Sequence, residues 1–292
     1  MTMENPDRFS DFPPAPRFIQ IETTTACNAV CPFCRQKDLQ RGPVKMEDRL
    51  WRKIIAETRG LGVAYRPFLQ NEPLCDARLE EIVAYIKQDP TARVELNTNG
   101  ELLPEKRART LLALGLDEVR FSIDAVSAGV YEKTRPGIDR DAVYERVTRF
   151  CELAKKKSCM TRVRMIEMPE NAGERDEFKK YWEPLADSVE LVPLYRWPWS
   201  GQSEADTVLK PCLKILCEMF FFTDGRAVLC CWDIDGRGVI GDANASTVLE
   251  IWNGPVVGNF RKILARGERR KIHLCSRCDA YAHLDWKPPG KG

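Results

Sequence analysis

The chain has 292 residues, of which 43% are hydrophobic and 30% charged, which is ordinary for a globular protein with one large α/β domain and a smaller unit. A formal net charge of +2 without a long basic block argues against a nucleic-acid or anionic-membrane surface. The longest apolar runs fall far short of the ~20 residues of a membrane span, and no signal-peptide pattern opens the sequence, so we expect a cytoplasmic protein.

Strand-like runs alternate with helical patterns over residues 17–197. Strands are predicted at 17–22, 66–70, 92–100, 118–125, 161–168 and 188–197, with helices between them at 46–62, 76–89, 104–115, 140–156 and 173–186. Six strands joined through helices by short connections predict a parallel sheet with helices outside, curled toward a barrel. We therefore expect an α/β fold, a partial (β/α)6 barrel whose reactive loops follow the carboxyl ends of the strands.

The character of the sequence changes after residue 200. Residues 219–231 predict a hairpin around a Thr-Asp-Gly turn, and short helices are expected at 248–254 and 259–268. This stretch is rich in cysteine and has little apolar core of its own, so a bound metal would substitute for the missing core. We divide the chain into an N-terminal extension (1–16), a barrel (17–200) and a cysteine-rich segment (201–292).

Twelve cysteines are the most unusual feature of the composition. In a reducing cytosol, clustered cysteines usually bind metal or carry out redox chemistry. Only two histidines are present, which nearly excludes chemistry built on imidazole. Seven cysteines fall into two spaced groups, namely Cys27, Cys31 and Cys34, then Cys212, Cys230, Cys275 and Cys278.

The first group has the spacing C-x-x-x-C-x-x-C, with Phe33 just before its last cysteine. Three thiolates on one tight loop can hold three irons of a 4Fe–4S cluster and leave the fourth iron open, while a zinc loop is the alternative. The motif resembles the radical S-adenosylmethionine (SAM) superfamily, and the resemblance covers nearly the whole chain. It implies that SAM binds the open iron and is cleaved to a 5′-deoxyadenosyl radical, which abstracts hydrogen from a substrate.

Further motifs follow the predicted strands in the order of that family. The stretch 71–73, Asn-Glu-Pro, is similar to the family's GGEP motif with Gln70 and Asn71 in place of the two glycines. The resemblance implies that Glu72 accepts a bond from the methionyl ammonium of SAM, and that Arg135 pairs with the methionyl carboxylate.

Two more strand-end motifs, NTNG (97–100) and SIDA (122–125), match family positions. They imply that Asn97, Ser122 and Asp124 lie near the ribose or the carboxylate of the cofactor. Taken alone, each of these residues is equally a loop or cap residue, and it is the ordered set that carries the resemblance.

The second cysteine group resembles the C-terminal SPASM/Twitch cluster-binding segments of the same superfamily. Its four well-spaced ligands match the shorter Twitch form, which implies one auxiliary 4Fe–4S cluster in addition to the SAM-binding one. A structural zinc site is the alternative, because four cysteines with a terminal C-x-x-C suit zinc equally well.

The remaining thiols matter because a thiol can donate a hydrogen atom in a radical reaction, and Cys217, inside the cluster-binding segment, is our candidate. Cys75 is expected to face the barrel, and Cys231 to point away from its neighbouring ligand if that run is a strand.

Arg164 and Arg196 are candidates for contacting substrate hydroxyls or acting on a released proton. Small buried side chains are expected at Cys151 and Cys159, and pocket-lining or core aromatic rings at Tyr195, Trp197 and Trp199.

Enzymes that resemble this short Twitch form include dehydrogenases that oxidise a secondary alcohol of an aminocyclitol, and sugar epimerases. We therefore expect a radical SAM oxidoreductase or epimerase that acts on a polar small molecule, with flavodoxin or ferredoxin as electron donor and no nucleic-acid or membrane partner. A peptide-modifying enzyme is the alternative, disfavoured by the short stretch before the first strand. A zinc- or cluster-binding scaffold without turnover is the non-enzymatic alternative.

Overall fold

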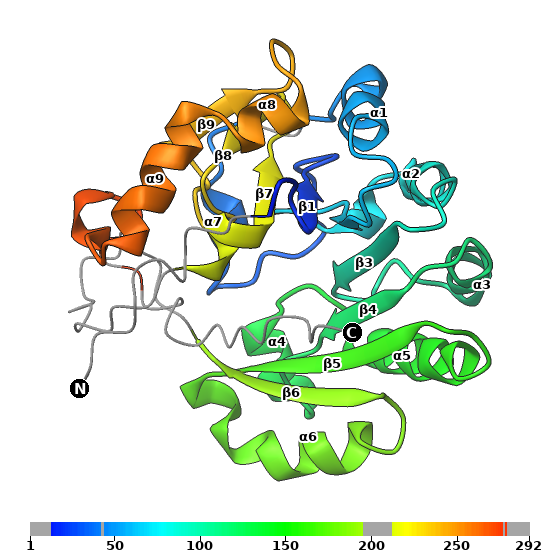
Figure 1. The fold of residues 1–292 in the computed structure, drawn as a ribbon. Helices are drawn as coiled ribbons and strands as arrows, with labels where there is room; N and C mark the ends of the chain where they lie inside the picture. The colour runs from blue at the N-terminus through cyan, green and yellow to red at the C-terminus, as the bar shows by residue number, and fades with distance from the viewer. Residues whose placement is uncertain (1–12, 42–43, 195–211, 277, 279–292) are drawn as a thin grey trace, which may run out of the picture.

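All the strands that the structure describes belong to one sheet. The structure is a computed structural model that describes residues 13–41, 44–194, 212–276 and 278 (Figure 1). In the described chain the strand order is β6-β5-β4-β3-β2-β1-β7-β8-β9. Strands β1 to β6 are parallel and lie side by side in chain order, which confirms the predicted α/β barrel-like sheet.

The parallel strands are β1 (Phe18–Ile21), β2 (Ala64–Arg66), β3 (Arg93–Thr98), β4 (Glu118–Ser122), β5 (Met160–Glu167) and β6 (Ser188–Pro193). The second of these lies earlier than predicted, because it ends at Arg66, where the prediction began. Pro67 follows immediately, and a proline cannot donate a hydrogen bond to a neighbouring strand.

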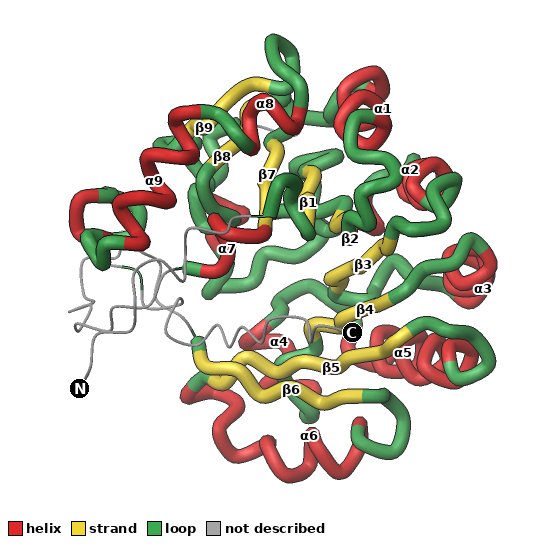
Figure 2. The backbone as a smooth tube through the Cα atoms, in the orientation of Figure 1, coloured by secondary structure: helices red, strands yellow, loops and turns green. Residues whose placement is uncertain are grey.

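The helices between these strands cover one face of the sheet, as the helix and strand colours of Figure 2 show. They are α1 (Asp48–Ala56), α2 (Leu79–Ile86), α3 (Glu105–Ala113), α4 (Ala128–Thr134), α5 (Arg140–Ala154) and α6 (Arg175–Trp182), with 3-10 turns at η2 (Arg35–Asp38), η3 (Pro73–Cys75) and η4 (Pro169–Glu174). Each predicted helix is present, and α4 was not predicted. It is short, and its start depends on Ser127, whose hydroxyl accepts a hydrogen bond from the Val130 N–H.

The cysteine-rich segment continues the same sheet. Strand β7 (Glu218–Phe221) runs parallel to β1, with Phe18 opposite Glu218. Strand β8 (Arg226–Val228) pairs antiparallel with β7, and β9 (Val239–Asp242) pairs antiparallel with β8. The predicted hairpin is therefore present. Gly225 makes its turn at a φ of 92°, where a Cβ atom would meet Asn244 Nδ2 at 2.5 Å. The remaining elements are α7 (Leu213–Cys217), α8 (Val248–Trp252), α9 (Pro255–Ala265) and η5 (Arg269–Lys271).

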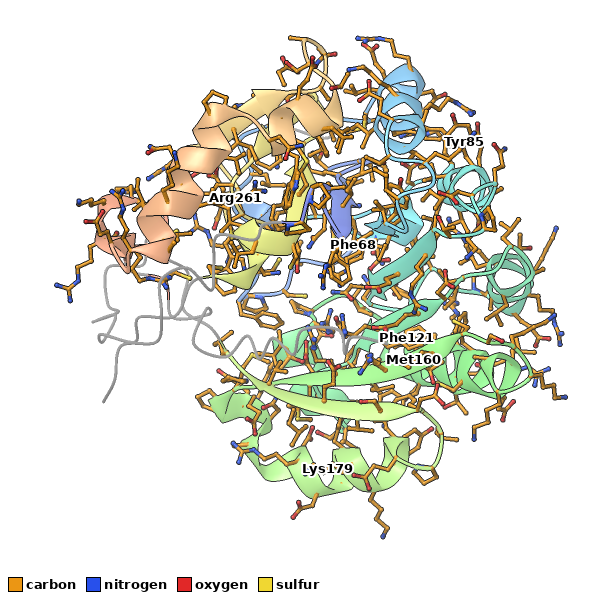
Figure 3. The ribbon with its side chains drawn as sticks, viewed as in Figure 1. Phe68, Tyr85, Phe121, Met160, Lys179 and Arg261 are labelled. Atoms are coloured by element: carbon orange, nitrogen blue, oxygen red, sulfur yellow. The ribbon has the colours of Figure 1, made fainter. Side chains whose placement is uncertain are left out.

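One hydrophobic core serves the barrel and the cysteine-rich segment. Ile19 and Ile21 of β1 belong to the same buried cluster as Phe221, Trp252 and Leu264. The segment thus has little core of its own, as expected, and pairing with β1 lets it share the core of the sheet. Figure 3 shows the layering, with Phe121 inside and Lys179 on the outer surface of α6.

The face of the sheet opposite the helices carries charged side chains. Burial alternates along β3, β4 and β5, so that fully buried residues such as Val94 and Phe121 pack against the helices. The alternate positions are partly exposed and polar, among them Glu95, Arg120 and Arg164. We call this charged surface the inner face, and it is the floor on which the strand-end loops converge.

Candidate functional site

The first cysteine group lies on the loop that follows β1. The backbone N–H of Ala29 lies 3.4 Å from Cys27 Sγ, and that of Gln36 lies 3.4 Å from Cys34 Sγ, so both sulfurs accept backbone hydrogen bonds. Burial raises the pKa of Cys27 to about 12 and also raises the pKa values of Cys31 and Cys34. A buried thiol with a raised pKa stays protonated without a metal. It loses its proton when it binds one, because the metal stabilises the thiolate form.

Glu72 lies at the centre of the hydrogen bonds beneath this loop. Its Oε1 accepts from Thr98 Oγ1 at 2.6 Å and from the Leu74 N–H at 3.1 Å, and its Oε2 accepts from the Asn99 N–H at 2.8 Å. Burial raises the pKa of Glu72, while these three donors oppose that rise. The carboxylate thus joins the turn after β2 to the end of β3, in addition to its predicted role toward the methionyl ammonium.

Asn28 ties the cysteine loop to the same two strand ends. Its Oδ1 accepts from Asn99 Nδ2 at 2.9 Å and lies 3.7 Å from Cys75 Sγ, and its Nδ2 donates to Glu101. In the NTNG motif Asn99 therefore contacts the cysteine loop, while the place of Asn97 near the cofactor stays a prediction. Alternation alone does not separate the two residues, because positions 97 and 99 have the same parity; Asn99 differs in that it follows the end of β3 at Thr98.

Asp124 and Arg135 form a buried ion pair beside the first cysteine group. Arg135 Nη2 lies 2.6 Å from Asp124 Oδ2, with side chains that are 7% and 0% exposed. Arg135 Nη1 also lies 3.7 Å from Cys31 Sγ, which brings a guanidinium against a predicted iron ligand. Asp124 adopts a φ of 67°, which its short polar side chain tolerates, and its Oδ1 accepts from the Ile166 N–H at 2.7 Å.

The inner face holds the other predicted residues of the barrel. Asn97 Oδ1 accepts from Arg120 Nη1 at 3.2 Å, and Ser122 stands opposite Arg164 in the strand register. Arg164 Nη2 lies 2.7 Å from Glu190 Oε2, which also receives Arg120 Nε at 3.1 Å. These side chains offer paired donors and acceptors to a polar molecule above the sheet.

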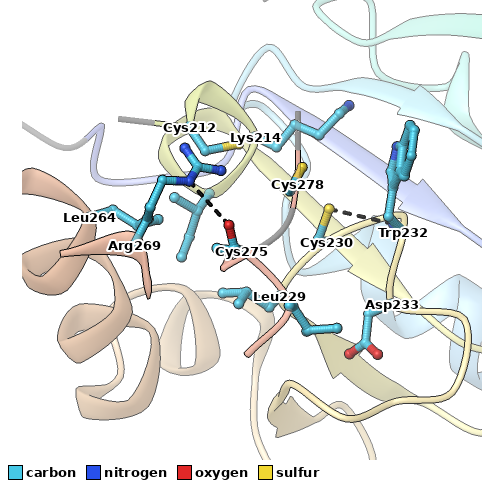
Figure 4. Close-up of a pocket in the computed structure, with 12 residues that line it drawn as sticks. Cys212, Lys214, Leu229, Cys230, Trp232, Asp233, Leu264, Arg269, Cys275 and Cys278 are labelled. Carbon is cyan, nitrogen blue, oxygen red and sulfur yellow. Dashed lines mark hydrogen bonds between the residues drawn. The ribbon is translucent and has the colours of Figure 1, made fainter. Parts of the chain in front are cut away.

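The second cysteine group gathers around one pocket (Figure 4). Cys212 precedes α7, Cys230 follows β8, and Cys275 and Cys278 come from the turn after η5, yet all four line the same cavity. Burial raises the pKa of Cys275 to about 12. The structure therefore brings together four thiols that are up to 66 residues apart in the sequence, as the predicted ligand set requires.

The four thiols of this pocket are a suitable donor set for an iron–sulfur cluster. Within the described ranges, no three His, Cys, Asp or Glu side chains meet closely enough to share a single metal ion. A 4Fe–4S cluster needs each thiolate on a different iron, and hence four cysteines on the walls of a pocket, whereas zinc needs all four sulfurs at about 2.3 Å from one point. Cys212, Cys230, Cys275 and Cys278 line one cavity from three separate stretches of the chain.

Two residues that the sequence did not single out join this pocket to the inner face. Lys214 lines the pocket, and its Nζ lies 3.1 Å from Glu218 Oε2 on β7. Glu218 Oε2 also accepts from Gln20 Nε2 at 3.0 Å, and Glu218 Oε1 lies 3.5 Å from Arg66 Nη1. Burial alone would raise the pKa of Glu218, but Lys214 and Arg66 lower it.

The two remaining cysteines of this segment occupy different places. The condition set for Cys231, that its run is a strand, is not met, because β8 ends at Val228; Cys230 lines the four-cysteine pocket, whereas Cys231 packs against Phe220, Phe222 and Val228. Cys217 ends α7 and is 9% exposed, and burial raises its pKa to about 12. It does not line the four-cysteine pocket, and its role as a hydrogen-atom donor stays a prediction. Arg196, Tyr195, Trp197 and Trp199 lie outside the described residues.

Comparison with protein families explains why two cysteine sites share one chain. Residues 21–181 match the radical SAM superfamily. The chain belongs to the radical SAM superfamily. Residues 212–279 match SPASM, an iron-sulfur cluster-binding domain, so the four-cysteine pocket lies in the segment that carries auxiliary clusters. The match confirms the resemblance drawn from the cysteine motifs, and it implies SAM and iron–sulfur clusters as cofactors of this radical SAM enzyme.

Among curated relatives, the S-adenosyl-L-methionine-dependent 2-deoxy-scyllo-inosamine dehydrogenase of Niallia circulans is 23% identical over 265 residues, covering 89% of this chain and 92% of the relative. A probable GTP 3′,8-cyclase of Methanococcus maripaludis is 30% identical over 139 residues, covering 47% of this chain and 46% of the relative. The match thus spans less than half of the cyclase but nearly all of the dehydrogenase.

The fold of this radical SAM enzyme is also similar to a solved structure. The crystal structure of BtrN in complex with AdoMet and 2-DOIA matches with a TM-score of 0.63 at 19% identity, over 90% of this chain and 92% of that chain. This likeness confirms the predicted fold. Across the described ranges, every helix is too short or too polar to span a bilayer.

Proposed function

We propose that the chain is a radical SAM dehydrogenase that oxidises a secondary alcohol of a sugar or aminocyclitol. The observation that carries this proposal is the pocket of four cysteines. A cluster that takes a protein thiolate on every iron has no open iron to bind substrate, so its simplest use is to accept an electron from the substrate radical. The match to an aminocyclitol dehydrogenase over nearly both full lengths supports the same choice over the epimerase and peptide-modifying alternatives.

The first cysteine group, Glu72 and Arg135 would bind the cofactors. Bound SAM and the two clusters would supply the 5′-deoxyadenosyl radical and the electron transfer. Cys27, Cys31 and Cys34 would hold the first cluster, and Glu72 and Arg135 would orient the charged methionyl groups of SAM beside it. Since Glu72 and Arg135 are buried and held by hydrogen bonds, both would keep their orientation without the cofactor.

The inner face would bind the substrate. Arg164 and Glu190 lie next to each other and are partly exposed, with side-chain exposures of 28% and 21%. Substrate hydroxyls can donate to the carboxylate and accept from the guanidinium, as a polyhydroxylated ring requires. We expect flavodoxin or ferredoxin as the electron donor to the first cluster.

Anaerobic reconstitution tests the cofactor content. We expect about eight irons per chain and reductive cleavage of SAM to 5′-deoxyadenosine. About four irons, or zinc alone, would refute the two-cluster assignment.

A reaction in heavy water with candidate aminocyclitols and aminosugars tests the reaction type. Dehydrogenation gives a product that has lost two hydrogens, with one 5′-deoxyadenosine formed per ketone. Solvent deuterium retained at carbon, with no loss of hydrogen, would instead identify an epimerase and refute the proposed dehydrogenation.

A further inference from the structure

The four-cysteine pocket has two cations in its wall. Lys214 and Arg269 line it, and most of the other lining side chains are apolar, including Leu229, Leu264 and Leu274. Among the described residues that line it, Asp233 alone is acidic, and its carboxylate accepts hydrogen bonds from two backbone N–H groups of its own loop, at 2.8 and 2.7 Å. Positive charge therefore faces a site that four thiolates make negative.

Lys214 is held in place from the barrel side. It comes two residues after Cys212, and its side chain is 18% exposed. Its ammonium pairs with Glu218, which is 12% exposed and is itself fixed by Gln20 and Arg66 on the inner face. Glu218 does not line the pocket, so it opposes the charge of Lys214 from behind.

We propose that Lys214 is a positioning residue that raises the reduction potential of the auxiliary cluster and thereby makes it an electron acceptor. The inference rests on the proposed function, because it requires a cluster in the four-cysteine pocket. A reduced cluster carries one more negative charge than the oxidised one. A fixed cation at a pocket screened from water stabilises the more negative form, because the Coulomb interaction is stronger at low dielectric.

The pair Lys214–Glu218 gives two changes of opposite sign. Lys214→Met removes the cation while keeping an unbranched side chain, so the potential becomes more negative. Glu218→Gln removes the opposing anion while keeping the size of the side chain, so the potential becomes more positive. A merely structural role predicts no such reversal.

The measurement is an anaerobic redox titration followed by electron paramagnetic resonance. It uses the full chain with Cys27, Cys31 and Cys34 replaced by alanine, so that only the auxiliary cluster contributes. For Lys214→Met we expect the reduction equilibrium constant to fall by about tenfold, which is a shift of about 59 mV for a one-electron couple. Lys214→Arg, which keeps the charge, and Lys262→Met, which removes an exposed charge from α9, should both stay at the wild-type potential.

Each outcome decides the inference. Opposite shifts in Lys214→Met and Glu218→Gln support it, and unchanged potentials or shifts of the same sign overturn it. If iron analysis shows that Lys214→Met does not assemble the cluster, the sign of the Glu218→Gln shift decides alone. A chain with unaltered Lys214 that assembles no cluster in this pocket would instead refute the proposed function.

Discussion

Replacing Glu72 by glutamine separates the structural role of this carboxylate from its role toward SAM. Glu72 is 4% exposed and accepts three hydrogen bonds, two at Oε1 and one at Oε2. Glutamine supplies one acceptor oxygen. In its better orientation it keeps the bonds from Thr98 and Leu74, and its amide group then faces the N–H of Asn99, so that two donors oppose each other.

A buried donor left without an acceptor costs about 1–3 kcal/mol. We therefore expect Glu72→Gln to lower the free energy of unfolding by about 2 kcal/mol, which corresponds to a Tm roughly 5 °C lower for a chain of this size. The assay is thermal unfolding of the metal-free, reduced chain followed by circular dichroism, without SAM.

The matched control is Glu47→Gln, the same chemical change at a side chain that is 67% exposed. We expect it to alter stability by no more than about 0.5 kcal/mol. If Glu72→Gln unfolds at the wild-type temperature, the three hydrogen bonds contribute nothing to the fold, and the carboxylate acts on the cofactor alone.

Three further changes address the other parts of the site. Asp124→Ala leaves the Arg135 guanidinium buried without its partner, so urea unfolding should show a loss of about 3–5 kcal/mol, and an unchanged midpoint would contradict a working ion pair. Cys212→Ser should reduce the iron content from about eight to about four per chain, whereas a content that stays at eight would remove Cys212 from the ligand set. Burial alone would raise the pKa of Glu190, but Arg120 and then Arg164 lower it. The ionised carboxylate therefore stabilises the fold above a pH of about 4, and this contribution is lost as the pH falls through the lowered folded-state pKa. Acid unfolding should therefore be less steep in Glu190→Gln than in the wild type, and equal slopes would contradict the lowered pKa.

The elements of the barrel could be predicted because their patterns are local. Alternating burial marks β3 and β5, and the spacing of Cys27, Cys31 and Cys34 alone identifies the loop that bears them. The start of α4 depends on a single serine cap, which the sequence analysis did not identify. The early end of β2 depends on Pro67, a local signal that the strand prediction did not use.

The parts that were missed are set by pairings between distant segments. Nothing near Glu218 indicates that its strand lies against β1, because that pairing joins residues 200 positions apart. The roles of Lys214 and Glu218 could not be predicted from the sequence, because they depend on the position of β7 between the inner face and the four-cysteine pocket. The strand that the expectation for Cys231 assumed does not reach that residue for a related reason, since the length of β8 is decided by its partners in the sheet.

The contact between β1 and β7 also has a consequence for how the chain is made. During synthesis, one edge of β1 keeps its N–H and C=O groups without partners until Glu218 and the residues after it have left the ribosome. Such an open edge invites association with other chains, and its late closure across a long loop slows folding. We therefore expect the barrel and the cysteine-rich segment, which match two separate families, to fold as one cooperative unit, and a nascent chain halted before β7 to be prone to aggregation.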